Sequence, residues 1–76
     1  MPANGERSIR NRMTVLRAER GMSQREVADK LGVSRQTIIS LEKNRYNPSL
    51  KLAFDIAILF GVELQDVFQY EAEEEN

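Results

Sequence analysis

The sequence predicts an all-α fold, a compact bundle of five short helices, and two features of the chain support this prediction. Gly21 and Gly61 each follow a stretch with helical spacing of apolar residues and precede an apolar residue, which is a common end of a helix. No stretch alternates between apolar and polar residues in the way expected of a half-buried strand. With 76 residues, the chain should form one small domain with a modest core.

Capping residues mark where the expected helices begin. The helices are expected at about residues 8–20, 24–31, 35–43, 49–60 and 64–70. Ser23 and Glu26 are spaced as a capping box for the second helix, and Ser34 and Ser49 should cap the third and fourth. Asn44 stands where the third helix must end, and asparagine tolerates the left-handed conformation that such an end usually requires.

The two ends of the chain carry little apolar surface. Residues 1–7 are expected to be a flexible segment and the acidic residues 71–76 a disordered tail, so that the folded domain spans residues 8–70. The opening residues contain no apolar signal segment, and the longest apolar stretch, Leu52 to Val62, is too short to span a bilayer. We therefore expect a cytoplasmic protein that does not insert into membranes.

Two residue types are absent from the sequence, and their absence narrows the function. Without histidine or cysteine, neither a Ser/His/Asp nor a Cys/His catalytic group can form, and zinc would have only carboxylate ligands. No disulfide can form within the chain either. We expect no enzymatic activity, no metal site and no cofactor.

The net charge of −1 hides a strong asymmetry along the chain. Residues 1–45 carry ten Lys and Arg against five Asp and Glu, a balance of +5. Residues 46–76 carry one Lys against seven Asp and Glu, a balance of −6. The first half can therefore face phosphates, whereas the second half is repelled by them.

The most informative segment runs from Gln24 to Glu42, where two short helices are expected across a turn of three or four residues. Their backbones approach closely, and Ala28 supplies the small residue that this approach needs. Gly32 lies four positions later, in the turn, where a positive φ costs glycine little. Five apolar residues are placed to hold the two helices at their angle: Val27, Leu31, Val33, Ile38 and Leu41. This pattern is typical of a helix-turn-helix formed by the second and third helices.

The segment resembles the Cro/repressor-type (xenobiotic-response-element type) helix-turn-helix regulators. The resemblance extends over about residues 8–69 and includes the closing run Leu41 to Arg45, followed by Asn47-Pro48-Ser49. It implies a five-helix, repressor-like DNA-binding domain whose third helix enters the major groove of double-stranded DNA. It also implies a homodimer on a palindromic operator, the usual arrangement in the family.

A helical wheel of the third helix separates core-facing from groove-facing residues. With Ile38 and Leu41 turned inward, the outward positions are Gln36, Ile39, Ser40 and Lys43, with Arg35 at the margin. Arg35 can bond the O6/N7 edge of guanine and Gln36 the N6/N7 edge of adenine, and each such pair discriminates by about 1–3 kcal/mol. The plainer interpretation of Arg35 is an ordinary solvated charge.

The resemblance assigns base reading to the positions of Arg35 and Gln36 and, one turn later, of Ser40. Thr37, beside this row, can present a methyl or a hydroxyl group to DNA. Ile39 is an unusual residue on such a face. It either contacts a thymine methyl group or is a scattered surface apolar residue of no consequence.

Contacts with the DNA backbone are expected around the motif. Gln24 begins the second helix, where free amides favour a phosphate, and the family uses the matching glutamine there. The other residues expected to contact the backbone are Ser23, Ser34, Lys43, Arg45 and Tyr46. Arg10 and Arg12 either reach a phosphate or only solubilise the first helix.

Glu42 lies close to Ile38 on the wheel, so its carboxylate is expected to be partly buried and to need a partner. In the family, the matching partner is the residue at the position of Arg17 on the first helix. The resemblance therefore implies a structural salt bridge between Arg17 and Glu42 rather than a contact with DNA.

The fourth helix is apolar most of the way round. One side can fill the core together with residues of the fifth helix, which gives the expected core set Leu52, Ala53, Ile56, Ala57, Phe60, Leu64, Val67 and Phe68. Phe54 and Ile58 remain as a second stripe, and such a stripe often marks a partner surface. Alternatively, both residues pack beneath the N-terminal segment.

The resemblance places the dimer contact at the end of the fourth helix and the start of the fifth. The residues expected in it are Phe54, Ile58, Val62, Leu64 and Tyr70. The chain departs from the family pattern at Ile58, which is often charged there, and at Glu63, which is often a serine cap. The second departure leaves the start of the fifth helix open.

The sequence thus favours a dimeric transcriptional regulator, most simply a repressor that occupies its operator. The alternative is an antitoxin or adaptor module with the same fold, in which the acidic second half and the apolar stripe bind an unidentified protein.

Overall fold

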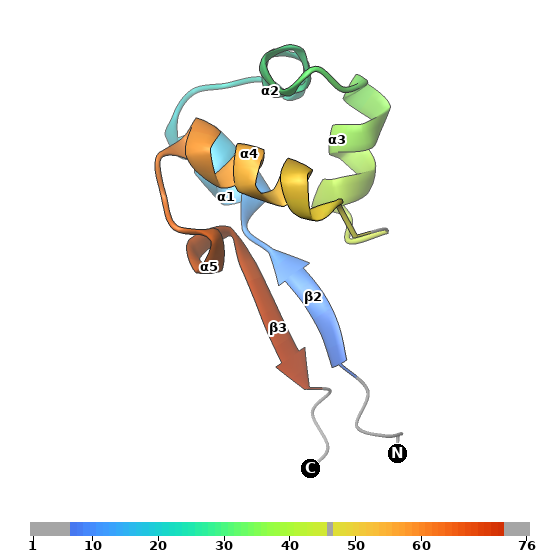
Figure 1. Ribbon diagram of the computed structural model, residues 1–76. Helices are drawn as coiled ribbons and strands as arrows, with labels where there is room; N and C mark the ends of the chain where they lie inside the picture. Colours follow the sequence, from blue (N-terminus) through green and yellow to red (C-terminus); the bar gives the residue numbers. More distant parts are fainter. Residues whose placement is uncertain (1–6, 46, 73–76) are drawn as a thin grey trace.

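The computed structural model describes residues 7–45 and 47–72. These residues form five helices, as the sequence predicts, and two strands (Figure 1). The elements follow in the order β2 (Arg7–Asn11), α1 (Met13–Glu19), α2 (Gln24–Leu31), α3 (Arg35–Glu42), α4 (Leu50–Phe60), α5 (Leu64–Val67) and β3 (Phe68–Ala72). None of the helices in these two ranges is long and apolar enough to cross a bilayer.

The two strands correct the sequence analysis, which expected helix from residue 8 and up to residue 70 and no strand at all. β2 pairs with β3 in an antiparallel ribbon, from Arg7 opposite Ala72 to Asn11 opposite Phe68. Helix α1 therefore begins only at Met13, and α5 ends at Val67. The strands also take in Arg7, Glu71 and Ala72, which the sequence analysis assigned to the terminal segments.

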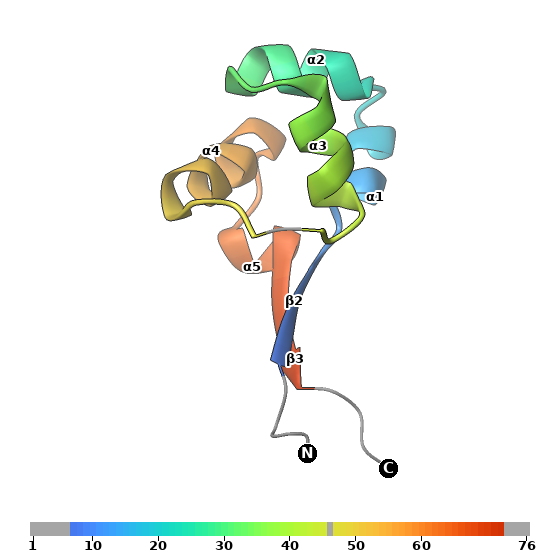
Figure 2. The same ribbon diagram turned by 90° about the vertical axis from the view of Figure 1, so that its right-hand side faces the viewer.

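The ribbon and the helix pair α2–α3 lie toward opposite ends of the molecule. The molecule measures 39 × 22 × 21 Å along its principal axes. In both views α2 and the start of α3 lie at one end, and the ribbon extends away from the helices at the other (Figures 1 and 2).

The core lies between the helices and confirms most of the predicted apolar set. Its buried residues are Met13, Leu16, Val27, Ala28, Ile38, Leu41, Ile56, Ala57, Phe60 and Val67. Leu52 and Phe68 pack against this core but are only partly buried, as are Leu31 and Val33 beside the turn. Fully burying a side chain the size of valine or leucine stabilises the fold by roughly 1.5–3 kcal/mol, so these residues hold α2, α3 and α4 together.

Arg20, at the end of α1, fastens this helix to the end of α4. Its Nε donates to the carbonyl of Phe60 at 3.0 Å and its Nη1 to the carbonyl of Leu16 at 3.0 Å. The guanidinium also lies 5.5 Å from the centre of the Phe60 ring, within the range of a cation–π interaction. This arginine therefore has a structural role at the junction of two helices.

Candidate nucleic-acid interface

The turn between α2 and α3 has the backbone geometry that the sequence predicts. Gly32 ends α2 with φ 74° and ψ 30°, in the left-handed region. Its amide donates to Asp29, and the amide of Val33 donates to Ala28, which closes the last turn of the helix. A Cβ at Gly32 would meet no atom within 4 Å, so glycine is favoured here by backbone conformation and not by space.

Both helices of the motif begin at the predicted serine caps. Ser23 and Glu26 form the expected capping box: the Glu26 amide donates to Ser23 Oγ at 3.0 Å and the Ser23 amide to Glu26 Oε1 at 2.9 Å. At α3, the Thr37 amide donates to Ser34 Oγ at 3.0 Å, and the two hydroxyl groups of these residues lie 2.9 Å apart. Thr37 is half-buried, and Ser34 gives its hydroxyl group a partner within the protein.

Helix α3 buries the two residues predicted to face the core and exposes two of the five residues predicted to read bases. Ile38 and Leu41 are fully buried. Arg35, Gln36 and Lys43 are exposed. Thr37, Ile39 and Ser40 are only half-buried, so Ile39 and Ser40 offer less surface than a simple wheel suggests.

The salt bridge expected between Arg17 and Glu42 is present. Arg17 Nε donates to Glu42 Oε2 at 2.8 Å and Nη2 to Oε1 at 3.2 Å, so the pair is bidentate. The Arg17 side chain is 18% exposed and that of Glu42 only 7%. Arg17 Nη1 also donates to the carbonyl of Met22 at 3.0 Å, which ties the end of α1 to the end of α3 and to the segment before α2.

Two opposing effects act on the pKa of Glu42, and their net result is a pKa below its usual value. Burial raises this pKa because it disfavours the charged carboxylate. Hydrogen bonds from Arg17 and Gln24, together with the positive charge of Arg17, favour the carboxylate and lower the pKa by more. Glu42 is therefore ionised near neutral pH, as its two bonds with Arg17 require.

Gln24 connects this buried pair to the exposed start of α3, a role that the sequence analysis did not find. Its Nε2 donates to Glu42 Oε1 at 3.1 Å, and its Oε1 accepts from Arg35 Nη2 at 3.4 Å. The second contact is long for a hydrogen bond and correspondingly weak. Through Gln24, the buried carboxylate of Glu42 is nevertheless linked to the guanidinium of Arg35.

Asn11 holds the other end of α3 and was also missed, because the sequence analysis assigned it to a helix. Its Nδ2 donates to the carbonyl of Leu41 at 2.7 Å and to Oδ1 of Asn44 at 3.1 Å, and its Oδ1 accepts from the amide of Met13 at 3.0 Å. Asn44 has a φ of 57°, the left-handed conformation predicted for the end of this helix. The last residue of β2 therefore fixes the segment that carries Arg45.

The residues expected to contact the DNA backbone lie at the two ends of α3 and at the start of α2. Ser23 and Gln24 begin α2 and Ser34 begins α3, whereas the exposed side chains of Lys43 and Arg45 follow the last turn of α3. Tyr46 lies outside the described residues. Arg10 and Arg12, also exposed, lie on and just after β2 and not on a helix.

The residues expected in the dimer contact are spread over two sides of α4. Phe54, Ile58 and Tyr70 are exposed, and Val62 and Leu64 are half-buried. Leu64 lines a hollow beside the ribbon, whereas Ile58 lines another beside Lys30 and Leu31 of α2.

Comparisons with known proteins extend over most of the chain. The sequence pattern of the helix-turn-helix family matches residues 15–67. An uncharacterized HTH-type transcriptional regulator of Methanocaldococcus jannaschii is 53% identical over 66 residues, which cover 87% of this chain and 100% of that protein. The immunity repressor protein of Bacillus phage phi105 is 30% identical over 60 residues, 79% of this chain and 42% of the repressor. A candidate DNA-binding protein from Bacteroides fragilis, known from its crystal structure, has a TM-score of 0.74 at 30% identity, with coverage of 80% of this chain and 98% of that one.

Proposed function

The chain belongs to the helix-turn-helix family of transcriptional regulators, and from this premise we propose that it represses transcription as a homodimer that reads a palindromic operator through α3. In such a dimer the two copies of α3 lie about 34 Å apart, one turn of DNA, and enter successive major grooves on one side of the duplex. Because the proposed ligand is DNA, the same proposal places the protein in the cytoplasm.

The observation that carries this proposal is the exposed pair Arg35 and Gln36 on a firmly held first turn of α3. Ser34 caps this turn, and Ile38 anchors it in the core. A guanidinium and an amide here have the donor and acceptor groups needed for guanine and adenine edges. Ile39 and Ser40, half-buried one turn or less further on, contribute through van der Waals contact and a single hydroxyl group, and Thr37 through its methyl group.

The contacts that position α3 without reading sequence are assigned to the groups around it. Ser23, Gln24 and Ser34 lie at helix N-termini, where backbone amides and the helix dipole favour a phosphate. Lys43 and Arg45 supply positive charge at the other end of α3, and Tyr46 follows them in the sequence. Gln24 has a second part in this proposal, because its contact with Arg35 limits the directions in which the guanidinium can point.

Repression is favoured over activation because it needs nothing beyond binding. The phage relative is named an immunity repressor. A chain organised around one reading helix can block a promoter by occupying it, whereas an activator needs a further surface for the transcription machinery.

The proposal is tested by comparing specific with nonspecific DNA binding in single variants. Operator sequences are first selected from a pool of random duplexes with the full chain. Arg35→Ala and Gln36→Ala should each weaken binding by about 5- to 150-fold for each half-site of the selected operator, the equivalent of 1–3 kcal/mol, and leave binding to random DNA nearly unchanged.

Lys51→Ala is the matched control, because Lys51 is an exposed cation on α4, outside the helix-turn-helix. It should change neither binding constant. Equal losses on specific and random DNA for Arg35→Ala and Gln36→Ala would contradict base reading by these residues. A chain that selects no sequence at all would contradict the proposed function as a whole.

A further inference from the structure

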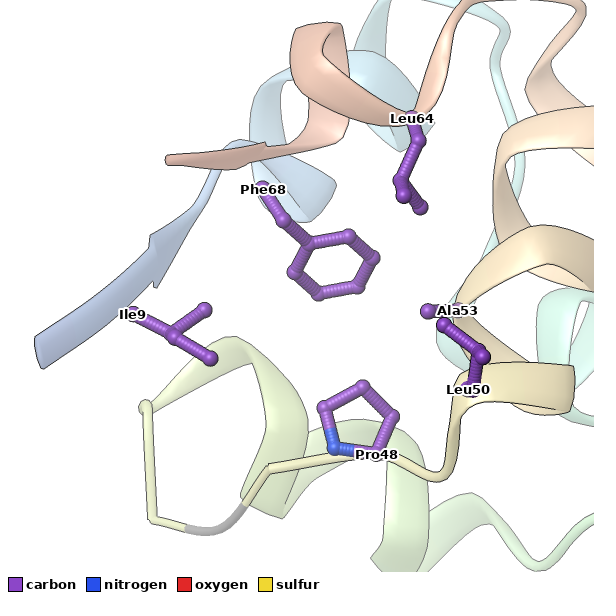
Figure 3. A pocket seen from close by; sticks show the side chains of 6 residues that line it. All are labelled: Ile9, Pro48, Leu50, Ala53, Leu64 and Phe68. Atoms are coloured by element: carbon purple, nitrogen blue, oxygen red, sulfur yellow. The ribbon is translucent and has the colours of Figure 1, made fainter. Parts of the chain in front are cut away.

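An apolar groove lies between the ribbon and the start of α4 (Figure 3). It encloses about 320 Å³. Figure 3 shows the Phe68 ring in the groove, with Ile9 of β2 on one side and Leu64 of α5 on the other. The described residues that line it are all apolar: Ile9, Pro48, Leu50, Ala53, Leu64 and Phe68.

One face of the ribbon continues the groove outward. In β3, Phe68 and Tyr70 are two residues apart and therefore lie on the same face. Ile9 is paired directly opposite Tyr70, so it shares that face. Tyr70 is 67% exposed. The apolar surface thus runs from Tyr70 across the groove to Leu50 on α4. Phe54 follows Leu50 by four residues and therefore lies beside it on this helix.

The chemistry of the groove fits a protein surface better than a small ligand. A ligand pocket usually combines apolar walls with a few polar groups that orient the ligand, and the described lining offers no polar side chain for this purpose. None of the described residues that line the groove carries a charge. An uncharged surface of this kind can meet a copy of itself without repulsion between like charges.

The exposed apolar area is close to what a small stable dimer needs. Leu50, Phe54 and Tyr70 are 70%, 48% and 67% exposed. If a large side chain contributes about 150–250 Å² when free, these three offer on the order of 350 Å², to which the groove walls add. A standard interface of about 800 Å² per partner, of which about 65% is apolar in a homodimer, uses roughly 520 Å² of apolar surface, so the groove walls must supply the rest.

From these observations we propose that the groove between the ribbon and α4 is the seat of a second copy of this chain, with Leu50 at its centre. The inference rests on the proposed dimeric regulator and locates its interface. It moves the centre of the contact from the end of α4, where Ile58 lies, to the start of this helix and the ribbon. A two-stranded ribbon alone is only marginally stable in water. The second copy would stabilise this ribbon by covering its apolar face, which carries Ile9, Phe68 and Tyr70.

The test is the mass of the full chain and its variants in sedimentation equilibrium. The unmodified chain should be a dimer at micromolar concentration, and Leu50→Glu should weaken the dimer at least tenfold, because two carboxylates would meet in an apolar contact. The substitution should not destabilise the folded monomer. Residue 50 is the exposed first residue of α4, and a negative charge there interacts favourably with the helix dipole. Leu50→Lys should have the same effect on the dimer.

Val15→Glu is the matched control, because Val15 is also an exposed apolar residue but lies on α1. It should leave the dimer intact. A dimer that persists in both Leu50 variants, or that dissociates in Ile58→Glu but not in Leu50→Glu, would overturn the proposed seat, as would an unmodified chain that is monomeric. If that monomer still preferred its selected half-site to random DNA, base reading by α3 would stand and only the interface would fall.

Discussion

Glu42 connects the stability of the fold to the geometry of α3 and of the side chains at its start. One of its oxygen atoms accepts from both Arg17 and Gln24, and the other accepts from Arg17. A bidentate pair of charged groups is stronger and more directional than a neutral hydrogen bond. Because Gln24 in turn contacts Arg35, the position of this carboxylate affects how the guanidinium of Arg35 is presented.

The lowered pKa of Glu42 predicts a pH dependence of stability that Glu42→Gln should lose. A carboxylate whose pKa in the folded chain is below its usual 4.5 stabilises the fold fully above pH 4.5, and this contribution disappears as pH falls through the folded-state pKa. The free energy of unfolding of the unmodified chain, measured in urea, should therefore fall more steeply below about pH 4.5 than that of the Gln variant. The two curves should differ by a constant above about pH 6.

Other carboxylates titrate in both proteins, so the difference between the two curves reports on Glu42 alone. Curves that stay parallel from neutral pH down to pH 3 would show that the pair with Arg17 does not favour the charged form of Glu42. A shared unfolding step near pH 4 with no difference between the proteins would lead to the same conclusion.

Single residues also show where the sequence alone was sufficient. The burial of Ile38 and Leu41 follows from helical spacing, and the Arg17–Glu42 pair follows from the family pattern. The bridging position of Gln24 was not predictable in this way. The orientation of its amide depends on Glu42 and Arg35 together, which only the folded arrangement of α2 and α3 brings into contact.

Among the elements, the helices were predictable because each carries its own signals. Serine caps and apolar spacing act within a few residues of one another, and α2, α3 and α4 begin within one residue of the expected positions. The ribbon is different, since β2 and β3 come from opposite ends of the chain and are fixed by pairing with each other. A short signal was present in β3, where Phe68, Tyr70 and Ala72 alternate with polar residues.

The contact between β2 and α3 predicts that Asn11→Ala will loosen the end of α3. The variant loses the bonds from Nδ2 to the Leu41 carbonyl and to Asn44, and also the bond from the Met13 amide to Oδ1. The free energy of unfolding should fall by about 1–3 kcal/mol. Amide exchange measured by NMR should become faster at Asn44 and Arg45, while the capped start of α3 at Ser34 keeps its protection.

Asn47→Ala is the control for this variant, because Asn47 is an exposed asparagine in the connection between α3 and α4. It should change neither stability nor exchange by much. Uniformly faster exchange across α3 in Asn11→Ala would mean that Asn11 supports the fold as a whole and has no special hold on this helix end.

At the scale of the whole molecule, the acidic half of the chain does not prevent binding to DNA. The balance of +5 belongs to residues 1–45, which include α2 and α3, and the balance of −6 to residues 46–76. The molecule is 39 Å long, and the ribbon, which pairs β2 of the first half with β3 of the second, extends away from α2 and the start of α3 (Figure 1). At 0.1 M salt, exposed charges farther apart than about 10 Å are largely screened from each other. The charges near α3, and not the net charge of −1, therefore govern the encounter with phosphates.

This separation predicts how binding should depend on salt. Lys43 and Arg45 are the two cations proposed to meet phosphates in each copy, so a dimer neutralises about four phosphates. In a plot of the logarithm of the binding constant against the logarithm of the salt concentration, the slope should therefore be near −4. Lys43→Gln removes two of these contacts from the dimer and should bring the slope to about −2, on operator and random DNA alike. Lys51→Gln removes the same charge from α4, outside the helix-turn-helix, and should leave the slope unchanged. Binding isotherms between about 50 and 200 mM salt measure all three slopes. Equal slopes for the two lysine variants would contradict the assignment of Lys43 to the DNA backbone, because Lys43 directly follows α3 whereas Lys51 lies on α4.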